Sequence, residues 1–175
     1  MKHTTELPTD TLVTEYRSPL GGIILAASGD ALRGAWFKDQ KYACAGLVSL
    51  EYVPASQGLF PEVTRWLDAY FAGYDPLPSF PREPSGTDFQ KRVWAELLTV
   101  PYGKTATYKA IADRIECKSA RAVGSAIGRN PISLIIPCHR VIGSGGELTG
   151  YAGGLERKRK LLALERSAIS KMSIR

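Results

Sequence analysis

A proline-rich stretch over residues 74–86 constrains the fold of this chain more than any other feature of its sequence. It contains Pro76, Pro78, Pro81, Pro84 and Gly86. Proline lacks a backbone N–H and fixes one backbone torsion, so neither a helix nor a central strand is expected to cross this stretch. It is typical of a linker and predicts two domains, an N-terminal one over 1–85 that includes the linker and a C-terminal one over 86–175.

The residues before the linker predict a small antiparallel sheet followed by one helix. Apolar and polar residues alternate over 11–17, and short apolar runs follow at 23–27 and 31–37, with glycine-containing turns between them. Pro61 suits the first turn of a helix, and apolar residues then recur at helical spacing as far as Gly73.

The residues after the linker predict a mostly helical domain. Apolar residues at helical spacing indicate helices over about 87–98, 108–115, 119–128 and 155–166. The second and third of these are joined by a short turn, and together they have the dimensions of a helix-turn-helix. The fold class expected for the whole chain is therefore α+β.

The two predicted domains differ in net charge. Residues 1–85 contain 7 Lys and Arg against 10 Asp and Glu, whereas residues 86–166 contain 14 against 7. The excess positive charge of the second domain favours a polyanionic partner such as nucleic acid. Because many soluble domains are basic without binding DNA, charge alone does not identify the partner.

The helix predicted over 119–128 has an unusual exposed face. Its apolar residues fall on one side, and the other side carries Arg121, Gly124, Ser125 and Gly128 at helical spacing. A helix that reads the major groove needs several long polar side chains, which this face lacks. Small residues around one arginine favour a close, sequence-independent approach to the minor groove, with Arg121 inserted into the base stack. Packing of this face against a neighbouring helix is the alternative.

Cys138 stands beside His139 at the end of an apolar, β-branched run over 131–136. We expect this run to enter the core as an extended segment that Pro137 ends. The adjacent imidazole and the glycine-rich loop that follows favour a nucleophilic cysteine, and a buried inert cysteine is the alternative. Because successive residues of an extended segment face opposite ways, Cys138 and His139 need a local turn or a bridging water to interact.

The other cysteines and histidines suggest no further site. The chain contains Cys44, Cys117, Cys138, His3 and His139. The odd number and irregular spacing of the cysteines favour neither a disulfide framework nor a zinc site. No apolar run approaches the length of a membrane span, and the first residues lack the apolar core of a signal peptide. We therefore expect a cytoplasmic protein with no metal ion and no membrane contact.

Several short motifs follow one another in a specific order over residues 86–166. Around the cysteine stands Pro137-Cys138-His139-Arg140-Val141, and the other motifs are Gly86-Thr87-Asp88-Phe89-Gln90 with Val93-Trp94, Val100-Pro101-Tyr102-Gly103, Thr107-Tyr108, Ala120-Arg121-Ala122-Val123-Gly124, Arg129-Asn130-Pro131, Gly150-Tyr151-Ala152-Gly153-Gly154 and Leu161-Leu162-Ala163-Leu164-Glu165. This order resembles the O6-alkylguanine-DNA alkyltransferases, the methylated-DNA–protein-cysteine methyltransferases. The N-terminal half resembles the family only in general shape.

The resemblance implies direct reversal of DNA damage without a cofactor. The expected reaction is an irreversible, single-turnover transfer of the alkyl group from O6-alkylguanine, and from O4-alkylthymine, to Cys138. In the family the histidine after the cysteine takes its proton through a water, and a glutamate of the last helix steadies that histidine; the matching residues are His139 and Glu165. Asn130 is expected to tie the preceding helix to the cysteine segment. Apart from the resemblance, Glu165 fits an exposed helix position and Asn130 an ordinary turn.

The resemblance also implies a DNA partner, namely double-stranded DNA that contains O6-alkylguanine and is contacted in its minor groove. The damaged nucleotide leaves the stack, Arg121 fills the vacated space, and Tyr108 pushes on the backbone phosphate. Gly124 and Ser125 are expected to lie against the DNA on the same helix face as Arg121. We expect a monomer in solution that is able to assemble cooperatively on DNA.

The resemblance also implies that the lesion pocket is lined by Tyr151, Ala152 and Val141. The glycines of the loop over 143–154 allow it to bend closely around a flat base. Some relatives carry a serine where this chain has Ala152. The smaller side chain leaves room, so we predict tolerance of alkyl groups larger than methyl.

Other functions explain less of the sequence. A helix-turn-helix regulator needs long readout side chains, which the face over 121–128 lacks. A cysteine hydrolase with a Cys138–His139 pair leaves the other motifs unexplained. An alkyltransferase-like protein that binds lesions without removing them lacks the cysteine, so the presence of Cys138 argues against that function. The basic run over 157–160 is either a DNA-facing surface or a solvated helix face.

Overall fold

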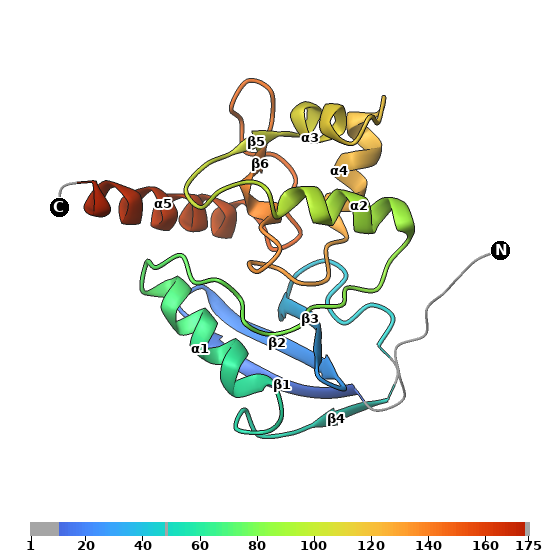
Figure 1. The fold of residues 1–175 in the computed structure, drawn as a ribbon, viewed down its shortest axis with the longest axis vertical. Coiled ribbons are helices and arrows are strands. Elements are labelled where there is room, and N and C mark those ends of the chain that lie inside the picture. The colour runs from blue at the N-terminus through green and yellow to red at the C-terminus, as the bar shows by residue number, and fades with distance from the viewer. Residues whose placement is uncertain (1–10, 48, 174–175) are drawn as a thin grey trace. The chain divides into compact units, whose positions relative to one another are not determined.

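The computed structural model describes residues 11–47 and 49–173, and the chain forms two compact units (Figure 1). The N-terminal unit ends at Thr87 and also contains the segment Pro131–Ile135. The C-terminal unit consists of Asp88–Asn130 and the chain from Ile136 onward. The division expected from the linker placed every residue after 85 in the second domain, and the segment 131–135 departs from it.

A four-stranded sheet forms the base of the N-terminal unit. β1 (Thr11–Ser18), β2 (Gly21–Ser28) and β3 (Ala31–Phe37) make the antiparallel meander that the alternating pattern predicts. β4 (Leu50–Tyr52) pairs in parallel with β1 and completes the order β3-β2-β1-β4. The sequence analysis missed β4 because its residues are all exposed, and so short a strand shows no alternation.

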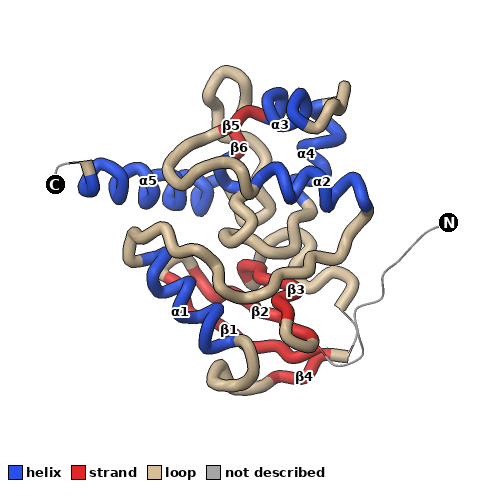
Figure 2. The backbone as a smooth tube through the Cα atoms, in the orientation of Figure 1, coloured by secondary structure: helices blue, strands red, loops and turns tan. Residues whose placement is uncertain are grey.

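One helix, α1 (Phe60–Phe71), lies beside this sheet (Figure 2). Pro61 occupies its first turn, as expected. The Tyr16 hydroxyl of β1 donates a 2.7 Å hydrogen bond to Asp68 Oδ1 of α1, and Val63 and Leu67 are fully buried. Apolar contacts supplemented by this polar one therefore fix the helix to the sheet.

The proline-rich stretch contains no helix, but its second part is not a free linker. The backbone N–H of Leu32 in β3 donates to Pro81 O (2.9 Å), and Glu83 N donates to Leu32 O (2.9 Å). Phe80 is buried, and the Trp66 indole N–H donates to Pro76 O (2.7 Å). Backbone pairing therefore holds this part of the stretch along β3.

The apolar run 131–135 also pairs with β3. Ala35 N donates to Pro131 O (2.8 Å), and Ser133 N donates to Ala35 O (2.9 Å). The run is buried, as expected, but it is not extended as far as the cysteine, because Leu134 adopts a left-handed backbone conformation (φ 72°). The expectation of an extended segment ending at Pro137 was wrong, since the chain reverses after its contact with the sheet.

The C-terminal unit is mostly helical, as expected. Its elements are α2 (Asp88–Leu97), β5 (Ala106–Thr107), α3 (Tyr108–Arg114), α4 (Ala120–Gly128), a 3₁₀ turn over Cys138–Arg140, β6 (Val141–Ile142) and α5 (Leu155–Met172). The side chains of Thr107 and Ser119 accept hydrogen bonds from the first turns of α3 and α4. The Trp94 indole of α2 donates to Ala126 O of α4 (2.9 Å). α5 extends beyond the expected residue 166, because neither glycine nor proline interrupts it there and Ala168 is still buried.

None of the helices in the described part of the chain is both long and apolar enough to span a membrane. The expected cytoplasmic location stays a prediction.

Candidate active site

Cys138 begins the 3₁₀ turn and is only 4% exposed. Its backbone N–H donates to Ile136 O (2.8 Å), and Arg140 N donates to Pro137 O (3.1 Å). Of the two alternatives that the sequence analysis left open, a local turn or a bridging water, a local turn is present at Cys138 and His139. It removes the strand-like alternation, so the two side chains are not forced onto opposite faces.

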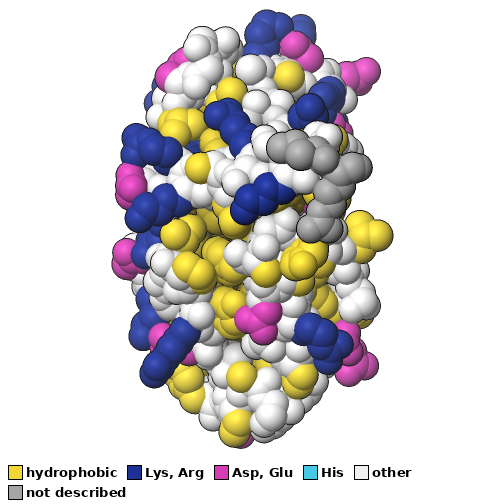
Figure 3. All heavy atoms as spheres, turned by 90° about the vertical axis from the view of Figure 1, so that its left-hand side faces the viewer, with side chains coloured by type: hydrophobic (Ala, Val, Ile, Leu, Met, Phe, Trp, Pro, Cys, Tyr) yellow, Lys and Arg dark blue, Asp and Glu magenta, His cyan; other side chains and the backbone are white. Residues whose placement is uncertain are grey.

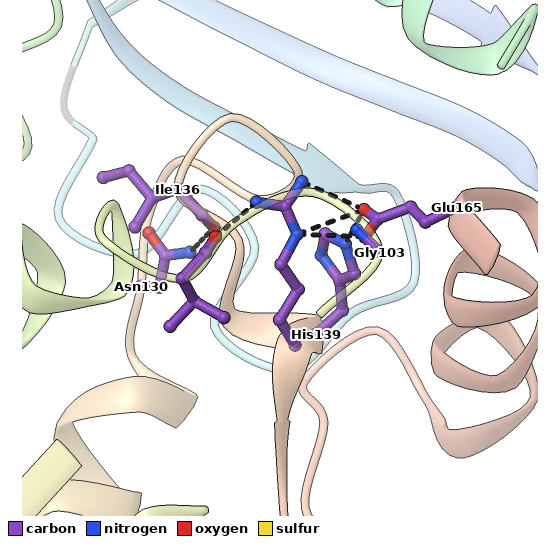
Figure 4. A network of polar contacts seen from close by, with 7 residues as sticks. Gly103, Asn130, Ile136, His139 and Glu165 are labelled. Atoms are coloured by element: carbon purple, nitrogen blue, oxygen red, sulfur yellow. Dashed lines mark hydrogen bonds and ion pairs between the residues drawn. The ribbon is translucent and has the colours of Figure 1, made fainter. Parts of the chain in front are cut away.

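Asn130 fixes the chain on either side of the segment that pairs with β3. Its side-chain Nδ2 donates to Ile136 O (2.9 Å), and Figure 4 shows Asn130 and Ile136 facing one another across this contact. Asn130 comes two residues after the end of α4, and Ile136 comes two residues before the cysteine turn. The buried amide thus ties the end of α4 to the cysteine segment, as the sequence analysis expected.

Burial raises the pKa of the Cys138 thiol above its usual value. A hydrogen bond with Asn130 and the positive charge of Lys158 act in the opposite direction, as do backbone hydrogen bonds. At neutral pH the resting group is therefore a protonated thiol, which needs a base before it can act as a nucleophile.

Glu165 of α5 is fully buried and accepts several hydrogen bonds (Figure 4). His139 Nε2 lies 2.6 Å from Oε1, and Gly103 N donates to Oε2 (2.9 Å). Arg140 contributes Nε at 3.0 Å from Oε2 and Nη2 at 3.2 Å from Oε1. Both oxygens of one carboxylate are thus satisfied by a histidine, an arginine and a backbone N–H.

A glycine is required where the chain meets this carboxylate. Gly103 has a left-handed conformation (φ 69°), and a Cβ atom built on it would lie 2.1 Å from Ile169 Cδ1 of α5. The backbone therefore approaches α5 closely enough to donate to Glu165 only because residue 103 has no side chain.

The charge states of the pair follow from these contacts. Burial lowers the pKa of His139, the carboxylate of Glu165 raises it, and the charges of Arg140 and Lys158 lower it further, so the net direction is downward. Burial by itself raises the pKa of Glu165, but the hydrogen bonds and charges of His139 and Arg140 lower it to about 2. At neutral pH the carboxylate is ionised and accepts hydrogen bonds only, so Nε2 of a neutral His139 carries the proton and Nδ1 the lone pair.

Lys158 is a functional candidate that the sequence analysis did not single out. It is fully buried, and its Nζ donates to Thr149 O (2.8 Å) and lies 5.8 Å from the centre of the Tyr108 ring. Burial lowers the pKa of Lys158 to about 8, although the negative charge of a Cys138 thiolate acts in the opposite direction. The sequence contained a signal, since Lys158, Leu161, Leu162 and Glu165 follow i, i+3, i+4, i+7 spacing and share the buried face of α5.

Tyr108 connects the cysteine neighbourhood with α4. Its hydroxyl donates to Thr149 O (2.9 Å) and Gly150 O (3.1 Å). A Cβ atom on Gly124 would lie 3.6 Å from the Tyr108 ring, so that glycine faces Tyr108 across α3 and α4. Burial raises the pKa of Tyr108, a hydrogen bond lowers it, and the charge of Cys138 raises it, which indicates that the ring lies near the thiol.

The three residues expected in the lesion pocket differ in their surroundings. Burial, followed by the charge of Cys138, raises the pKa of Tyr151 well above its ordinary value, and its hydroxyl is buried with no hydrogen-bond partner among the described residues. Val141 is fully buried and pairs with Ala106. Ala152 is half-buried. The Tyr151 hydroxyl is therefore available to form a hydrogen bond with a polar group of a bound base.

Arg121 and Ser125 are exposed on α4 and do not belong to the buried cluster. Gly128 on the same face is open, because a Cβ atom there would meet nothing within 4 Å. The small-residue face of α4 is therefore unobstructed apart from Gly124, which lies under Tyr108.

Basic side chains do not gather in one region on the face shown in Figure 3. Lys and Arg are spread there among apolar side chains. Within α5, Arg159 and Lys160 form ion pairs with Glu156, whereas Arg157 donates to Gly153 O (3.0 Å). The basic run over 157–160 is thus partly neutralised and includes the buried Lys158. Among the described residues no group of His, Cys, Asp and Glu could hold a metal ion.

Comparisons with known proteins match both units of the chain to the same family. Residues 88–167 match the model of the 6-O-methylguanine DNA methyltransferase DNA binding domain, and residues 12–81 match that of the ribonuclease-like domain of the same methyltransferase. The chain is 46% identical over 153 residues to a methylated-DNA–protein-cysteine methyltransferase of Mycobacterium leprae, covering 87% of this chain and 90% of that protein. It is 47% identical over 159 residues to the protein of the same name in Methanosarcina acetivorans, covering 87% and 96%.

A solved structure is also similar. The crystal structure of Mycobacterium tuberculosis OGT in complex with DNA superimposes with a TM-score of 0.81 at 44% sequence identity, covering 90% of this chain and 94% of that one.

Proposed function

The chain belongs to the methylated-DNA–protein-cysteine methyltransferases, and from this premise we propose that Cys138 is the residue that receives the alkyl group. The protein repairs DNA by alkyl transfer to a cysteine, and DNA is its partner. The observation that supports Cys138 is its setting: it is the buried cysteine among the described residues, and it is flanked by His139, Asn130 and Lys158. Cys44 and Cys117 are both more exposed than Cys138.

The proposed reaction is a nucleophilic displacement at the alkyl carbon of O6-alkylguanine. His139 takes the thiol proton on Nδ1 through a water, and Glu165 stabilises the resulting imidazolium through Nε2–H. The Cys138 thiolate then forms a carbon–sulfur bond as the carbon–O6 bond breaks, and the electron pair of that bond stays on guanine. A proton returned to guanine neutralises it. Because the thioether is stable, each molecule acts once.

The charge of Lys158 supports this step. A cation near a thiol stabilises the thiolate relative to the thiol, and Lys158 lowers the pKa of Cys138 against the effect of burial. The same lysine holds Thr149 O and so keeps the loop before Tyr151 close to the site.

The substrate must reach Cys138 outside the helical stack, because the O6 carbon is inaccessible within a duplex. Flipping a nucleotide out costs a few kcal/mol. We propose that α4 lies in the minor groove with Arg121 in the vacated space and that Ser125 and Gly128 allow the close approach. Gly124 is proposed to contribute by letting the Tyr108 ring pack against α4, where Tyr108 acts on the adjacent phosphate. The exposure of Arg121 and the open space at Gly128 support this docking.

Tyr151, Ala152 and Val141 are proposed to border the flipped base, and the small Ala152 to admit alkyl groups larger than methyl. O4-alkylthymine is the proposed second substrate. In solution the protein is proposed to be a monomer, with cooperative assembly confined to DNA.

The decisive experiment mixes the protein with a duplex that contains one O6-methylguanine and maps any added methyl by peptide mass spectrometry. One methyl on the Cys138 peptide, saturating at one per molecule, is the expected result. A methyl on Cys44 or Cys117 would reject the assignment, and a duplex without the lesion is the control. Comparable rates on O6-ethylguanine would support the role of Ala152, and strong rejection of ethyl would exclude it.

Docking through α4 has its own test. Gly128→Ala adds a methyl that meets no protein atom within 4 Å, so folding should be unaffected. It should weaken binding to duplex DNA and leave the reaction with the free O6-methylguanine base unchanged. Unaltered DNA affinity would place the DNA elsewhere.

A further inference from the structure

Arg140 occupies an unusual place for a residue that touches neither the thiol nor, in the proposed reaction, the substrate. Its side chain is only 10% exposed. Nε and Nη2 contact both oxygens of Glu165, and Nη1 donates to Val100 O (2.8 Å). The guanidinium also lies 5.5 Å from the centre of the Tyr102 ring. One side chain thus joins the cysteine turn, the turn after α2 at Val100, and α5.

We propose that Arg140 is a positioning residue for alkyl transfer: by holding both oxygens of Glu165 it keeps His139 neutral, with its proton on Nε2, and so ready to accept the Cys138 proton. The proposal rests on the proposed roles of Cys138 and His139.

The geometry supports this role in two ways. A carboxylate held by a bidentate arginine has a fixed orientation, because the planar fork of the guanidinium matches the plane of the carboxylate. His139 Nε2 therefore meets Oε1 in one orientation only, at 2.6 Å. The fixed carboxylate can only accept, so the imidazole presents its lone pair on Nδ1.

The charge of Arg140 has a second effect, which opposes that of Glu165. An isolated buried carboxylate beside His139 would favour the imidazolium and leave no base for the thiol. Arg140 offsets this attraction, and its charge lowers the pKa of His139. The arginine thus allows Glu165 to stabilise the imidazolium that forms during transfer without protonating the resting histidine.

The charged groups that shift the pKa of His139 lie on the cysteine turn and on α5. Its charged neighbours are Glu165, Arg140 and Lys158, and the titratable Cys138 precedes it in the chain. Tyr102 lies against Arg140. The buried residues of α2 are Val93, Trp94 and Leu97, which do not titrate. Of the two cations that lower the pKa of His139, removing Arg140 leaves Lys158.

The test measures the protonation of His139 and the transfer rate separately in the full-length protein. Imidazole NMR titration is simple here, because the chain has only two histidines and a His3→Asn variant assigns the other signal. In Arg140→Gln the pKa of His139 should rise by roughly one unit. The acidic limb of the rate–pH profile should therefore move to higher pH by the same amount. In Arg140→Lys, which keeps the charge but not the fork, the pKa should stay close to wild type while the transfer rate falls about tenfold.

Each outcome decides the proposal. A slower Arg140→Gln protein with an unchanged His139 pKa and an unchanged pH profile would overturn it and leave Arg140 a purely structural residue. If Arg140→Gln does not fold, a wild-type rate in Arg140→Lys would overturn the positioning role, and the tenfold loss would support it. Peptide mapping of the methyl on the wild-type protein tests Cys138 independently, so failure of the proposed function is recognised separately.

Discussion

The two units of this protein bury different kinds of polar side chain. The described polar residues buried in the N-terminal unit are all neutral: Thr11, Thr14, Ser28, Gln40 and Ser133. Those of the C-terminal unit are Asn130, His139, Arg140, Lys158 and Glu165, and all but the asparagine can ionise. Burying charge is unfavourable unless each group is paired and hydrogen-bonded. Burying this charged cluster therefore lowers the free energy of unfolding of the C-terminal unit, whereas apolar packing stabilises the N-terminal unit.

The largest effect should come from the cysteine at the centre of the charged cluster. Cys138→Ser should abolish alkyl transfer, because a hydroxyl is far less ionised than a thiol and a much weaker nucleophile. Lesion binding should persist, since the two side chains are nearly the same size. Single-turnover assays and duplex binding together test both statements. Cys44→Ser and Cys117→Ser are the matched controls and should react normally; loss of transfer in either would contradict the assignment.

The second effect concerns the carboxylate that the cluster surrounds. Glu165→Gln should slow transfer about 100-fold, because the amide cannot stabilise the imidazolium that forms when His139 takes the thiol proton. Rapid-quench measurement of methyl transfer tests this. A matched control in the other unit is Glu15→Gln, which removes the exposed partner of Lys38 and should leave the rate unchanged.

The same pair of variants tests stability against pH. The pKa of Glu165 is about 2 in the folded protein and near 4.3 in an unfolded chain, so its contribution is complete above pH ~4.3 and disappears as the pH falls toward 2. This contribution is roughly 3 kcal/mol. Urea unfolding between pH 2 and 5 should therefore show a shallower acid dependence in Glu165→Gln than in wild type. An equally shallow dependence in Glu15→Gln would remove the distinction between the units.

A smaller effect is expected where the C-terminal unit meets DNA. In the proposed docking Arg121 fills the space left by the flipped nucleotide, so Arg121→Ala should reduce transfer from duplex DNA about tenfold. The reaction with free O6-methylguanine should be unchanged. Lys118→Ala, a neighbouring surface variant, should have a weaker effect; equal losses in the two variants would indicate a general electrostatic contribution.

The smallest effect on activity should come from the apolar core of the N-terminal unit. Ile23 is almost fully buried, and Ile23→Val should reduce the free energy of unfolding by about 1 kcal/mol. It should change neither the transfer rate nor its pH dependence, because no buried charge is disturbed. A shifted rate–pH profile would show that the sheet also influences the charged cluster.

The sequence predicts the regular elements well where local patterns determine them. The meander, α1, α3 and α4 follow from alternation, helical spacing and capping residues such as Ser119. It did not predict β4 or the pairing of 131–135 with β3. Both depend on contacts between residues far apart in the chain, and local patterns carry no information about such partners.

The site was predicted unevenly for a similar reason. The motif around Cys138 indicated the cysteine and His139, and the resemblance indicated Glu165 and Asn130. The burial of Lys158 was missed because a basic run is usually solvated, although its spacing from Glu165 along α5 contained the signal. The proposed role of Arg140 depends on its contacts with both carboxylate oxygens of Glu165, which only the folded arrangement reveals.

The pairing of residues 131–135 with β3 has a consequence for synthesis of the chain. During translation the N-terminal residues leave the ribosome first, and domains generally fold as units as they emerge. In this protein the strand β3 finds its partners Pro131 and Ser133 only after about half of the C-terminal unit, residues 88–130, has been made. The first unit to be synthesised is therefore completed late, by the same short segment that leads the chain to Cys138.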